Sequence, residues 1–120
     1  MPTLNLVTNV KVADPKAFVL EFSKFGADTL KKPEAYISVI FTYNELLTFG
    51  GNFDPAISLR IDSLDNISEE LNEGYSKAFF KFFKDKLGVK DDRGYVTFID
   101  PGRANMGHTS TTFATIFGKK

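Results

Sequence analysis

One pattern constrains the fold of this 120-residue chain more than any other: segments typical of strand, helix and strand follow one another twice. The first set occupies about 3–9, 14–30 and 36–43, and the second occupies 56–63, 66–87 and 94–100. A helix that joins two neighbouring strands makes them parallel and gives a right-handed crossover. The repetition therefore predicts an α+β fold, in which two β-α-β units form a two-layer sandwich with both helices on one sheet face.

Both expected helices carry recognisable signals at their ends. Asp14 can accept a hydrogen bond from a free backbone N–H, and Pro15 suits the first helical position. Asn66, with Glu69 three residues later, predicts a capping box for the second helix, which Gly88 is expected to end. Each helix has one apolar face, and these faces consist of Phe18, Phe22 and Phe25, and of Leu71, Tyr75, Ala78, Phe79, Phe82, Phe83 and Leu87. With 13 phenylalanines in the chain, we expect a core of aromatic rings.

The strands are indicated by alternation and by β-branched residues. Leu4 and Leu6 alternate with polar residues in the first strand, and Ile57, Leu59 and Ile61 do so in the third. A last short extended segment is expected over 111–114.

The second strand, 36–43, carries apolar residues on both faces. Tyr36 and Ile40 lie on one face of it, and Ile37, Val39 and Phe41 lie on the other. Because the two helices cover only one face of the sheet, the apolar second face predicts contact with another subunit. We therefore expect a homo-oligomer.

The length and composition fit a single domain covering 1–120. Hydrophobic residues make up 42% of the chain and charged residues 25%, as in ordinary globular proteins. The two pseudo-repeats lie at about 2–50 and 55–114, and a C-terminal tail follows at 115–120. Glycine and proline at Phe49-Gly50-Gly51 and Asp54-Pro55 mark the loop between the repeats.

Charge and composition exclude several classes of function. Fifteen basic residues balance fifteen acidic ones, which disfavours nucleic acid and anionic membranes as partners. There is no cysteine and one histidine, so a thiolate nucleophile is excluded and a transition-metal site is not expected. No segment has the apolar run of a signal peptide or a membrane span. We expect a cytoplasmic protein, or one exported without a signal peptide, that needs no cofactor.

Pro2 is the first candidate for chemistry. Removal of Met1 would expose a secondary amine, and a terminal amine with a pKa of about 7.7–8.0 can become a general base after modest burial. Proline at this position also suits the entry into a strand. Lys32 could bind an anionic substrate or keep the amine neutral, but a lysine at a helix C-terminus is also what the helix dipole favours. His108 suits a pocket wall and a surface loop equally.

Several motifs occur together in one order and spacing. They are Pro2, Thr8-Asn9-Val10, Lys32-Pro33, Tyr36-Ile37, Phe49-Gly50-Gly51, Asp54-Pro55-Ala56, Ser63-Leu64, Tyr75-Ser76-Lys77, Asp92-Arg93, Tyr95, Ala104-Asn105-Met106-Gly107 and Thr112-Phe113-Ala114. In this combination the chain resembles the macrophage migration inhibitory factor and D-dopachrome tautomerase family of the tautomerase superfamily. The resemblance spans residues 2 to 114 and leaves out only the tail from Thr115.

The resemblance implies a homotrimer with active sites at the subunit interfaces. It implies a cofactor-free keto-enol tautomerase that acts on phenylpyruvate- or dopachrome-like aromatic substrates, with the processed Pro2 as acid-base catalyst. Lys32 and the Leu64 backbone amide would bind the substrate carboxylate, while Phe113 and the adjacent subunit's Tyr95 would form an aromatic slot. The substrate-binding residues implied are Lys32, Tyr36, Ser63, Leu64, Tyr95, Thr97, Met106, His108 and Phe113.

The chain departs from the family pattern at two of these positions. Thr97 stands where vertebrate members usually have asparagine, and His108 stands where they have tryptophan. A threonine hydroxyl reaches less far than an amide, and the histidine makes the pocket rim smaller and more polar. We therefore expect weaker substrate polarisation.

Two other functions fit the same resemblance. One is a non-enzymatic, cytokine-like signalling or host-modulating protein, in which a receptor-binding surface matters and the pocket is vestigial. The other is a related decarboxylase or dehalogenase, which would need extra arginines or carboxylates in the pocket, and Arg60 and Arg103 are the only candidates for that role.

Overall fold

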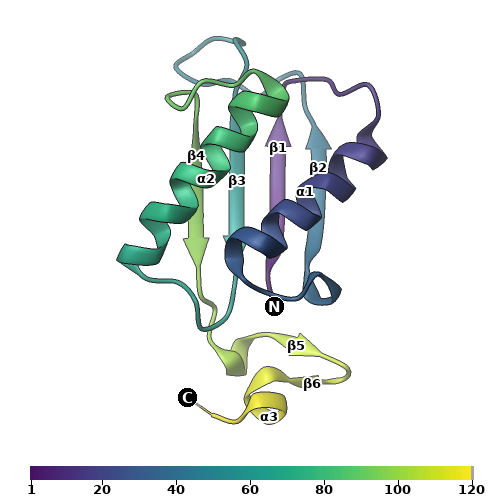
Figure 1. Ribbon diagram of the computed structural model, residues 1–120, viewed down its shortest axis with the longest axis vertical. Coiled ribbons are helices and arrows are strands. Elements are labelled where there is room, and N and C mark those ends of the chain that lie inside the picture. Colours follow the sequence, from purple (N-terminus) through teal and green to yellow (C-terminus); the bar gives the residue numbers. More distant parts are fainter. Residues whose placement is uncertain (120) are drawn as a thin grey trace.

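A four-stranded sheet in the order β2-β1-β3-β4 carries both long helices on one of its faces (Figure 1). The structure is a computed structural model and describes residues 1–119. The strands are β1 (Thr3–Thr8), β2 (Ser38–Tyr43), β3 (Ile57–Asp62) and β4 (Gly94–Ile99), and the helices are α1 (Pro15–Leu30) and α2 (Glu69–Leu87). The α+β class and the repeated β-α-β order predicted from the sequence are therefore confirmed.

Strand register determines which loops meet at each end of the sheet. β1 is parallel to β2, and β3 is parallel to β4, as expected from the helical crossovers. The two units join through antiparallel pairing of β1 with β3, in which Thr3 is opposite Asp62. The start of β1 therefore lies where β3 ends, and Pro2 is brought next to the segment that begins at Ser63.

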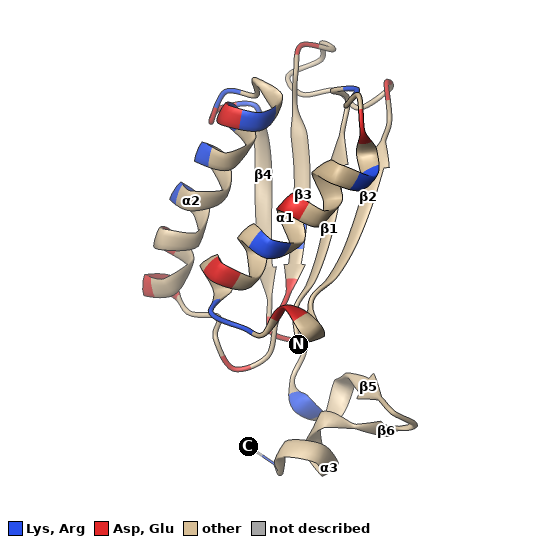
Figure 2. Ribbon diagram, turned by 45° about the vertical axis from the view of Figure 1, so that its right-hand side comes forward, with Lys and Arg blue, Asp and Glu red and all other residues tan. Residues whose placement is uncertain are grey.

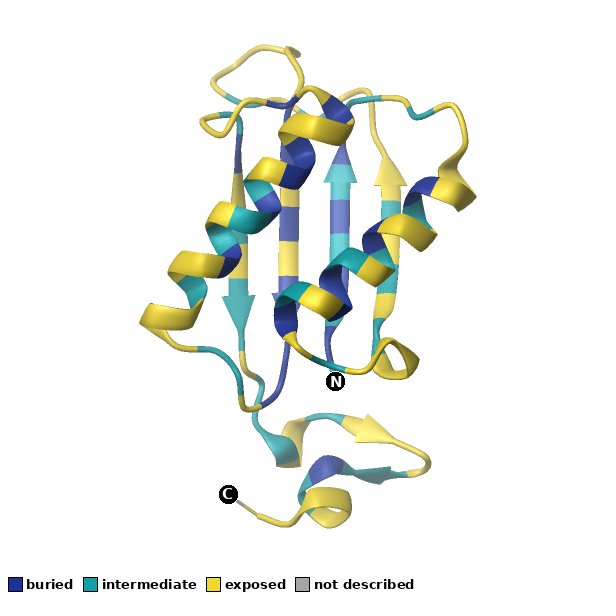
Figure 3. Cartoon of the chain, in the orientation of Figure 1, coloured by how far each residue is buried: buried dark blue, intermediate teal, exposed yellow. Residues whose placement is uncertain are grey.

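The core consists of aromatic and aliphatic side chains between the helices and the sheet. Figure 3 shows the buried positions, in dark blue, on both long helices and on the central strands β1 and β3. Leu4 and Leu6 of β1 are fully buried, as are Phe22 of α1 and Phe79 and Phe83 of α2. The Phe22 ring lies 6.0 Å from Phe79 and 5.7 Å from Phe83, measured between ring centroids. Such offset and edge-to-face pairs add to the free energy gained by burial alone. The predicted aromatic core is therefore present and holds both helices on the same face.

The helix ends agree with the sequence in one case and correct it in the other. Asp14 caps α1, with its Oδ1 accepting from the Ala17 N–H at 3.1 Å. The predicted Asn66 cap of α2 is wrong, because Ser68 Oγ accepts from the Leu71 N–H at 3.2 Å and the helix begins at Glu69. The Asn66 side chain instead donates to the Leu30 carbonyl at 3.2 Å, a contact between distant segments.

Two extended segments are shorter than predicted. Glu34–Tyr36 forms a single 3-10 turn after Pro33, so β2 begins at Ser38 and Tyr36 lies outside the strand. In the predicted segment 111–114, only Thr111–Thr112 is a strand (β6). The helix α3 (Phe113–Phe117) starts directly after it.

The sheet face away from the helices is less apolar than predicted. In β2, Val39 and Phe41 pack against the core, while Ile40 faces outward and is 47% exposed. Its β2 neighbours on that face, Ser38 and Thr42, are polar and exposed. Leu71 was likewise expected on the buried face of α2, but it lies in the first turn and is 47% exposed.

A small C-terminal unit extends beyond the end of the sheet where β4 finishes (Figure 1). It contains the 3-10 turn Arg103–Asn105, the strands β5 (Gly107–His108) and β6, and α3. β5 pairs with β6 in an antiparallel ladder, with Gly107 opposite Thr112. This unit therefore lies next to the start of β1.

Charged residues are spread over the helices and loops without a region of one sign (Figure 2). Lys81 pairs with Asp85 within α2 at 2.7 Å, and Lys86 of α2 pairs with Glu21 of α1 at 2.8 Å. Within residues 1–119, no helix is both long and apolar enough to span a membrane.

Two glycine substitutions test the close packing of β3 against β4. An added Cβ at Gly94 would collide with the Ile57 carbonyl oxygen and lie 2.8 Å from Ile57 Cδ1, whereas nothing lies within 4 Å of an added Cβ at Gly74 of α2. We expect Gly94→Ala to lower the free energy of unfolding by about 1–3 kcal/mol. The matched Gly74→Ala control should raise it by about 0.5–1 kcal/mol, because alanine favours helix. Urea unfolding followed by circular dichroism measures both, and equal effects would contradict the packing described.

Candidate active site

A cavity of about 300 Å³ opens at the end of the sheet where β1 begins. We call it the N-terminal cavity. Segments from three parts of the chain surround it: the N-terminus, the turn before β2 and the C-terminal unit. Its lining residues are Met1, Pro2, Thr3, Ala35, Tyr36, Ile37, Ser38, Met106, Gly107, His108 and Phe113. The structure thus brings Pro2 together with four of the other residues singled out in the sequence, namely Tyr36, Met106, His108 and Phe113.

Pro2 is buried and held by the sheet itself. Its carbonyl oxygen accepts a hydrogen bond from the Ser38 N–H at 3.0 Å, which extends the parallel pairing of β1 with β2 by one residue. The residue before β1 is therefore fixed at the inner end of the cavity.

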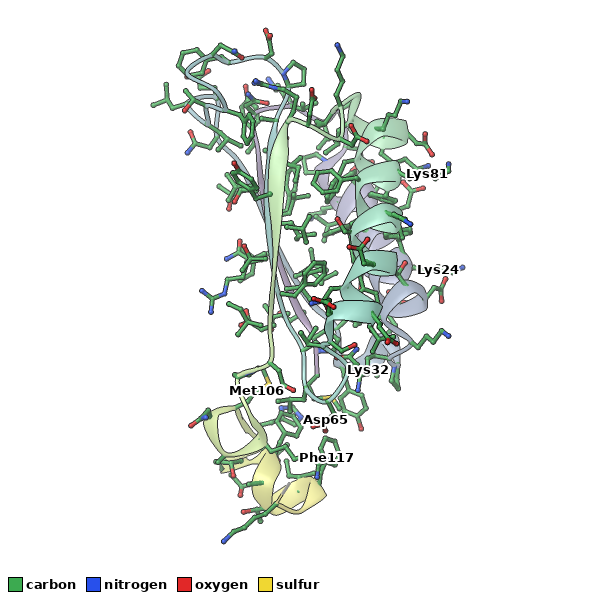
Figure 4. All side chains as sticks on the ribbon, turned by 90° about the vertical axis from the view of Figure 1, so that its left-hand side faces the viewer. Lys24, Lys32, Asp65, Lys81, Met106 and Phe117 are labelled. Atoms are coloured by element: carbon green, nitrogen blue, oxygen red, sulfur yellow. The ribbon has the colours of Figure 1, made fainter. Side chains whose placement is uncertain are left out.

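Lys32 lies at the same end of the molecule, after the last turn of α1 (Figure 4). Lys31 adopts the left-handed conformation that ends α1, and Lys32 follows it. The Lys32 ammonium donates to the Leu64 carbonyl at 3.1 Å. It does not line the cavity, but its charge acts on the amine of the N-terminus.

Two effects lower the pKa of the amine at this N-terminus below its ordinary value. Burial contributes most, because it disfavours the charged ammonium, and the Lys32 charge acts in the same direction. Asp65 and Asp100 act in the opposite direction. The amine belongs to Met1, and while Met1 is attached the Pro2 nitrogen is an amide without basicity. This end of the sheet is nevertheless an environment that favours a neutral amine.

An aromatic stack forms one wall of the cavity. The Phe113 ring is 3% exposed and lies parallel to the His108 imidazole, with the planes 8° apart and the centroids separated by 5.6 Å. Tyr36, from the turn before β2, is 47% exposed. These flat side chains suit a planar aromatic ligand better than a compact aliphatic one.

Besides Lys32, four more of the predicted site residues do not line the cavity. Ser63 and Leu64 are buried behind it, and the Ser63 N–H donates to the Ile99 carbonyl at 2.9 Å. Tyr95 is the second residue of β4, at the opposite end of the sheet, where it is 73% exposed and its ring lies 5.3 Å from that of Phe49. Thr97 lies on the open face of the sheet, exposed. Neither Tyr95 nor Thr97 of one chain reaches its own N-terminal cavity.

Some lining residues were not found from the sequence. Ala35 and Ser38 face the cavity because Pro33 is followed by a 3-10 turn rather than by a strand. Proline followed by an acidic residue is a usual start for such a turn, so the Pro33-Glu34 pair was the available signal. Within residues 1–119, no cluster of three histidine or carboxylate side chains could hold a metal ion.

The two-layer β-α-β duplication, with a proline buried at the entry to its first strand, defines a protein of the tautomerase fold. The family described as "Macrophage migration inhibitory factor (MIF)" matches residues 1–114. The chain belongs to this family.

Its relatives cover nearly the whole chain. It is 34% identical to macrophage migration inhibitory factor of Rattus norvegicus over 95% of this chain and 100% of that protein. It is 33% identical to a macrophage migration inhibitory factor homolog of Trichuris trichiura over 94% of this chain and 100% of that protein. The solved structure of the factor from Trichinella spiralis superposes with a TM-score of 0.86 at 30% identity, covering 92% of this chain and 99% of that one. Membership supports a function of the tautomerase or cytokine type.

Replacing Lys32 tests the electrostatic control of the terminal amine. Lys32→Met removes a positive charge that lowers the pKa of the amine, so the pKa of the N-terminus should rise. The matched variant Lys24→Met removes an exposed lysine of α1 that points away from this end of the sheet, and it should leave that pKa unchanged (Figure 4). The pH dependence of acylation of the N-terminal peptide, followed by mass spectrometry, measures both. A fall or no change in Lys32→Met would contradict the assigned role.

Proposed function

We propose that this protein is a cofactor-free keto-enol tautomerase for phenylpyruvate- or dopachrome-like aromatic substrates, with Pro2 as its acid-base residue once Met1 is removed. The observation that carries the proposal is the buried Pro2 in a cavity of about 300 Å³, at a place where burial and Lys32 lower the pKa of an amine. A base that works at neutral pH must be largely unprotonated there, and this environment favours that state.

The reaction needs one group that both accepts and returns a proton. The neutral Pro2 nitrogen takes the proton from the enol hydroxyl, which leaves an enolate and a protonated amine. The ammonium then gives this proton to the carbon: the electrons of the carbon–carbon double bond form the new carbon–hydrogen bond as the carbonyl double bond forms, which yields the keto form and restores the amine. Substrate and product differ only in the position of one proton, so no oxidant, metal or cofactor takes part.

Lys32 and the aromatic side chains account for the proposed substrate class. The Lys32 ammonium is held by the Leu64 carbonyl close enough to act on the terminal amine, and it would bind the carboxylate of an aryl-pyruvate. The aryl ring would lie against Phe113 and Tyr36, which line the cavity. His108 makes the rim more polar than tryptophan would, and we expect weaker activity than a tryptophan-bearing relative would have.

Self-association into a homotrimer is part of the proposal. Tyr95 is 73% exposed and lies at the opposite end of the sheet from its own cavity. A residue in that place can complete the cavity of an adjacent subunit, and the exposed Ile40 on the open sheet face would be covered by the same contact. Each active site would then combine Pro2 of one chain with Tyr95 of the next.

Replacing Pro2 tests the catalytic role directly. With Met1 removed, as verified by intact mass, the wild-type protein should convert enol hydroxyphenylpyruvate to its keto form faster than buffer does. Pro2→Gly should lower kcat/KM by about 10- to 100-fold, because it keeps an amine at the N-terminus but changes its basicity and position. Addition of EDTA should change neither rate.

A preparation that retains Met1 serves as the control, because its Pro2 nitrogen is an amide and should be inactive. The enzymatic reading of Pro2 is wrong if the processed wild type is no faster than buffer or if Pro2→Gly leaves the rate unchanged. In the first case a cytokine-like role in the same family remains the better description.

Mixing two variants tests whether the site is shared between subunits. Tyr95→Ala should raise KM for hydroxyphenylpyruvate, while Pro2→Gly should lower kcat. After co-refolding at equal concentrations, about a quarter of the sites should pair an intact Pro2 with an intact Tyr95, so the mixture should exceed the average of the two variants. Light scattering should give about 40 kDa, three times the 13.4 kDa of one chain. A 13.4 kDa particle, or strictly additive activity, would contradict the shared site.

A further inference from the structure

We infer that Arg103 is a positioning residue for the N-terminal cavity: its guanidinium ties Asp65 to the C-terminal helix α3 and thereby holds Phe113 in the cavity wall. The kinetic effects expected of Arg103 variants rest on the proposed function. The contacts of Arg103 and their effect on the C-terminal unit do not depend on it.

One side of the Arg103 guanidinium binds Asp65. Its Nε and Nη2 each lie 2.9 Å from Asp65 Oδ2, and both side chains are only about one-fifth exposed, at 21% and 22%. Asp65 is itself fixed, because its backbone has a left-handed φ of 67° and its N–H donates to Asp100 Oδ2 at 3.0 Å. Arg103 is therefore attached to a rigid point beside the end of β3.

The other side of the guanidinium binds the end of α3. Nη1 donates to the Phe117 carbonyl at 3.0 Å and to the Gly118 carbonyl at 2.8 Å. The guanidinium carbon also lies 5.7 Å from the centroid of the Phe117 ring. The family match ends at residue 114, so these partners belong to the part of the chain beyond it. A planar group with several fixed donors can make all these contacts at once.

Ring stacking extends this attachment to the cavity. The Phe117 ring lies 5.2 Å from the Phe113 ring, and Phe113 lies 5.6 Å from His108. Phe113 and His108 both line the N-terminal cavity. Loss of the Arg103 contacts would leave Phe117, which is 46% exposed, without its polar anchor, and Phe113 would lose the ring that covers its outer side.

The segment that holds Lys32 is connected to Arg103 through the neighbour of Asp65. Leu64 precedes Asp65 and accepts the hydrogen bond from Lys32. Arg103 therefore links the segment that holds Lys32 to the segment that holds Phe113. With all three of its nitrogens bonded within the chain, Arg103 is not placed to bind an anionic substrate, which argues against Arg103 as the substrate-binding arginine of a decarboxylase or dehalogenase.

Arg103→Ala tests the inference without requiring activity. Amide hydrogen exchange in 107–117 should become at least about fivefold faster, because the C-terminal unit loses its anchor, while exchange in α1 and β1 stays unchanged. Arg103→Lys keeps one positive charge but not the fork of donors, so its effect should be intermediate. Lys81→Ala, which removes a basic residue from an exposed ion pair, is the matched control and should change neither region.

Kinetics separate positioning from a general loss of structure. In the active, Met1-free enzyme, Arg103→Ala should raise KM about tenfold and change kcat by less than about twofold, because the wall that binds the ring is loosened while Pro2 stays in place. Phe117→Ala should act through the same path. In the double variant the KM effects should therefore be less than multiplicative.

The pH–rate profile gives a readout that a merely structural role would not move. Lys32, Asp65 and Asp100 are the charged groups that act on the amine of Met1, where Asp65 raises the pKa, and we expect them to act in the same way on the Pro2 amine once Met1 is removed. Without Arg103 the Asp65 charge is less compensated. The acid limb of the profile should then move to higher pH in Arg103→Ala and stay in place in Phe117→Ala.

The outcomes for the two proposals are distinguishable. A wild type that is inactive after Met1 removal overturns the proposed tautomerase function, and hydrogen exchange still decides the role of Arg103. Unchanged exchange in 107–117 of Arg103→Ala overturns the positioning role, as does an unchanged KM in an active enzyme.

Discussion

The antiparallel pairing of β1 with β3 is the constraint on which the rest of the structure depends. It is the one ladder that joins the two β-α-β units, and its register sets Thr3 opposite Asp62. Because of that register the chain's first residues meet the exit of β3 and the C-terminal unit, although these segments are separated by most of the sequence. The phenylalanine side chains between the helices and the sheet then hold α1 and α2 on the same sheet face. A cavity beside Pro2 follows from this topology before any substrate is considered.

Much of this architecture could be predicted from the sequence because it depends on local periodicity. The Phe18 and Phe22 face of α1 and the alternation of β3 are repeated over several residues, so single exceptions do not obscure them. The errors fall where a long-range contact decides. Asn66 and Ser68 are both good caps, but the helix begins at Glu69, so Ser68 takes the N-cap position. The bond from the Asn66 side-chain N–H to the Leu30 carbonyl directs that side chain toward the end of α1 instead. The short helix α3 was missed because Arg103 holds its end from outside the local sequence.

The candidate site, too, could be predicted only in part from the sequence. Pro2 and Phe113 come together within one chain, and the resemblance to the family anticipated this because their motifs keep a common order. Tyr95 was expected from an adjacent subunit, and in the single chain it lies at the far end of the sheet. Neither the sequence pattern nor the resemblance indicated the ion pair that supports the cavity wall. Asp65 and Arg103 are unremarkable in the sequence, and their pairing depends on two turns that meet in space.

The N-terminus and the segment held by Arg103 lie at the same end of the sheet, which has a practical consequence for handling the protein. An affinity tag before Met1 would turn the terminal amine into an amide, and a tag after the last residue would load the segment held by Arg103. A tag at either of the usual fusion points would therefore disturb a segment on which the cavity depends. An epitope or a fluorescent label is better placed in an exposed loop away from both of these segments and from Tyr95.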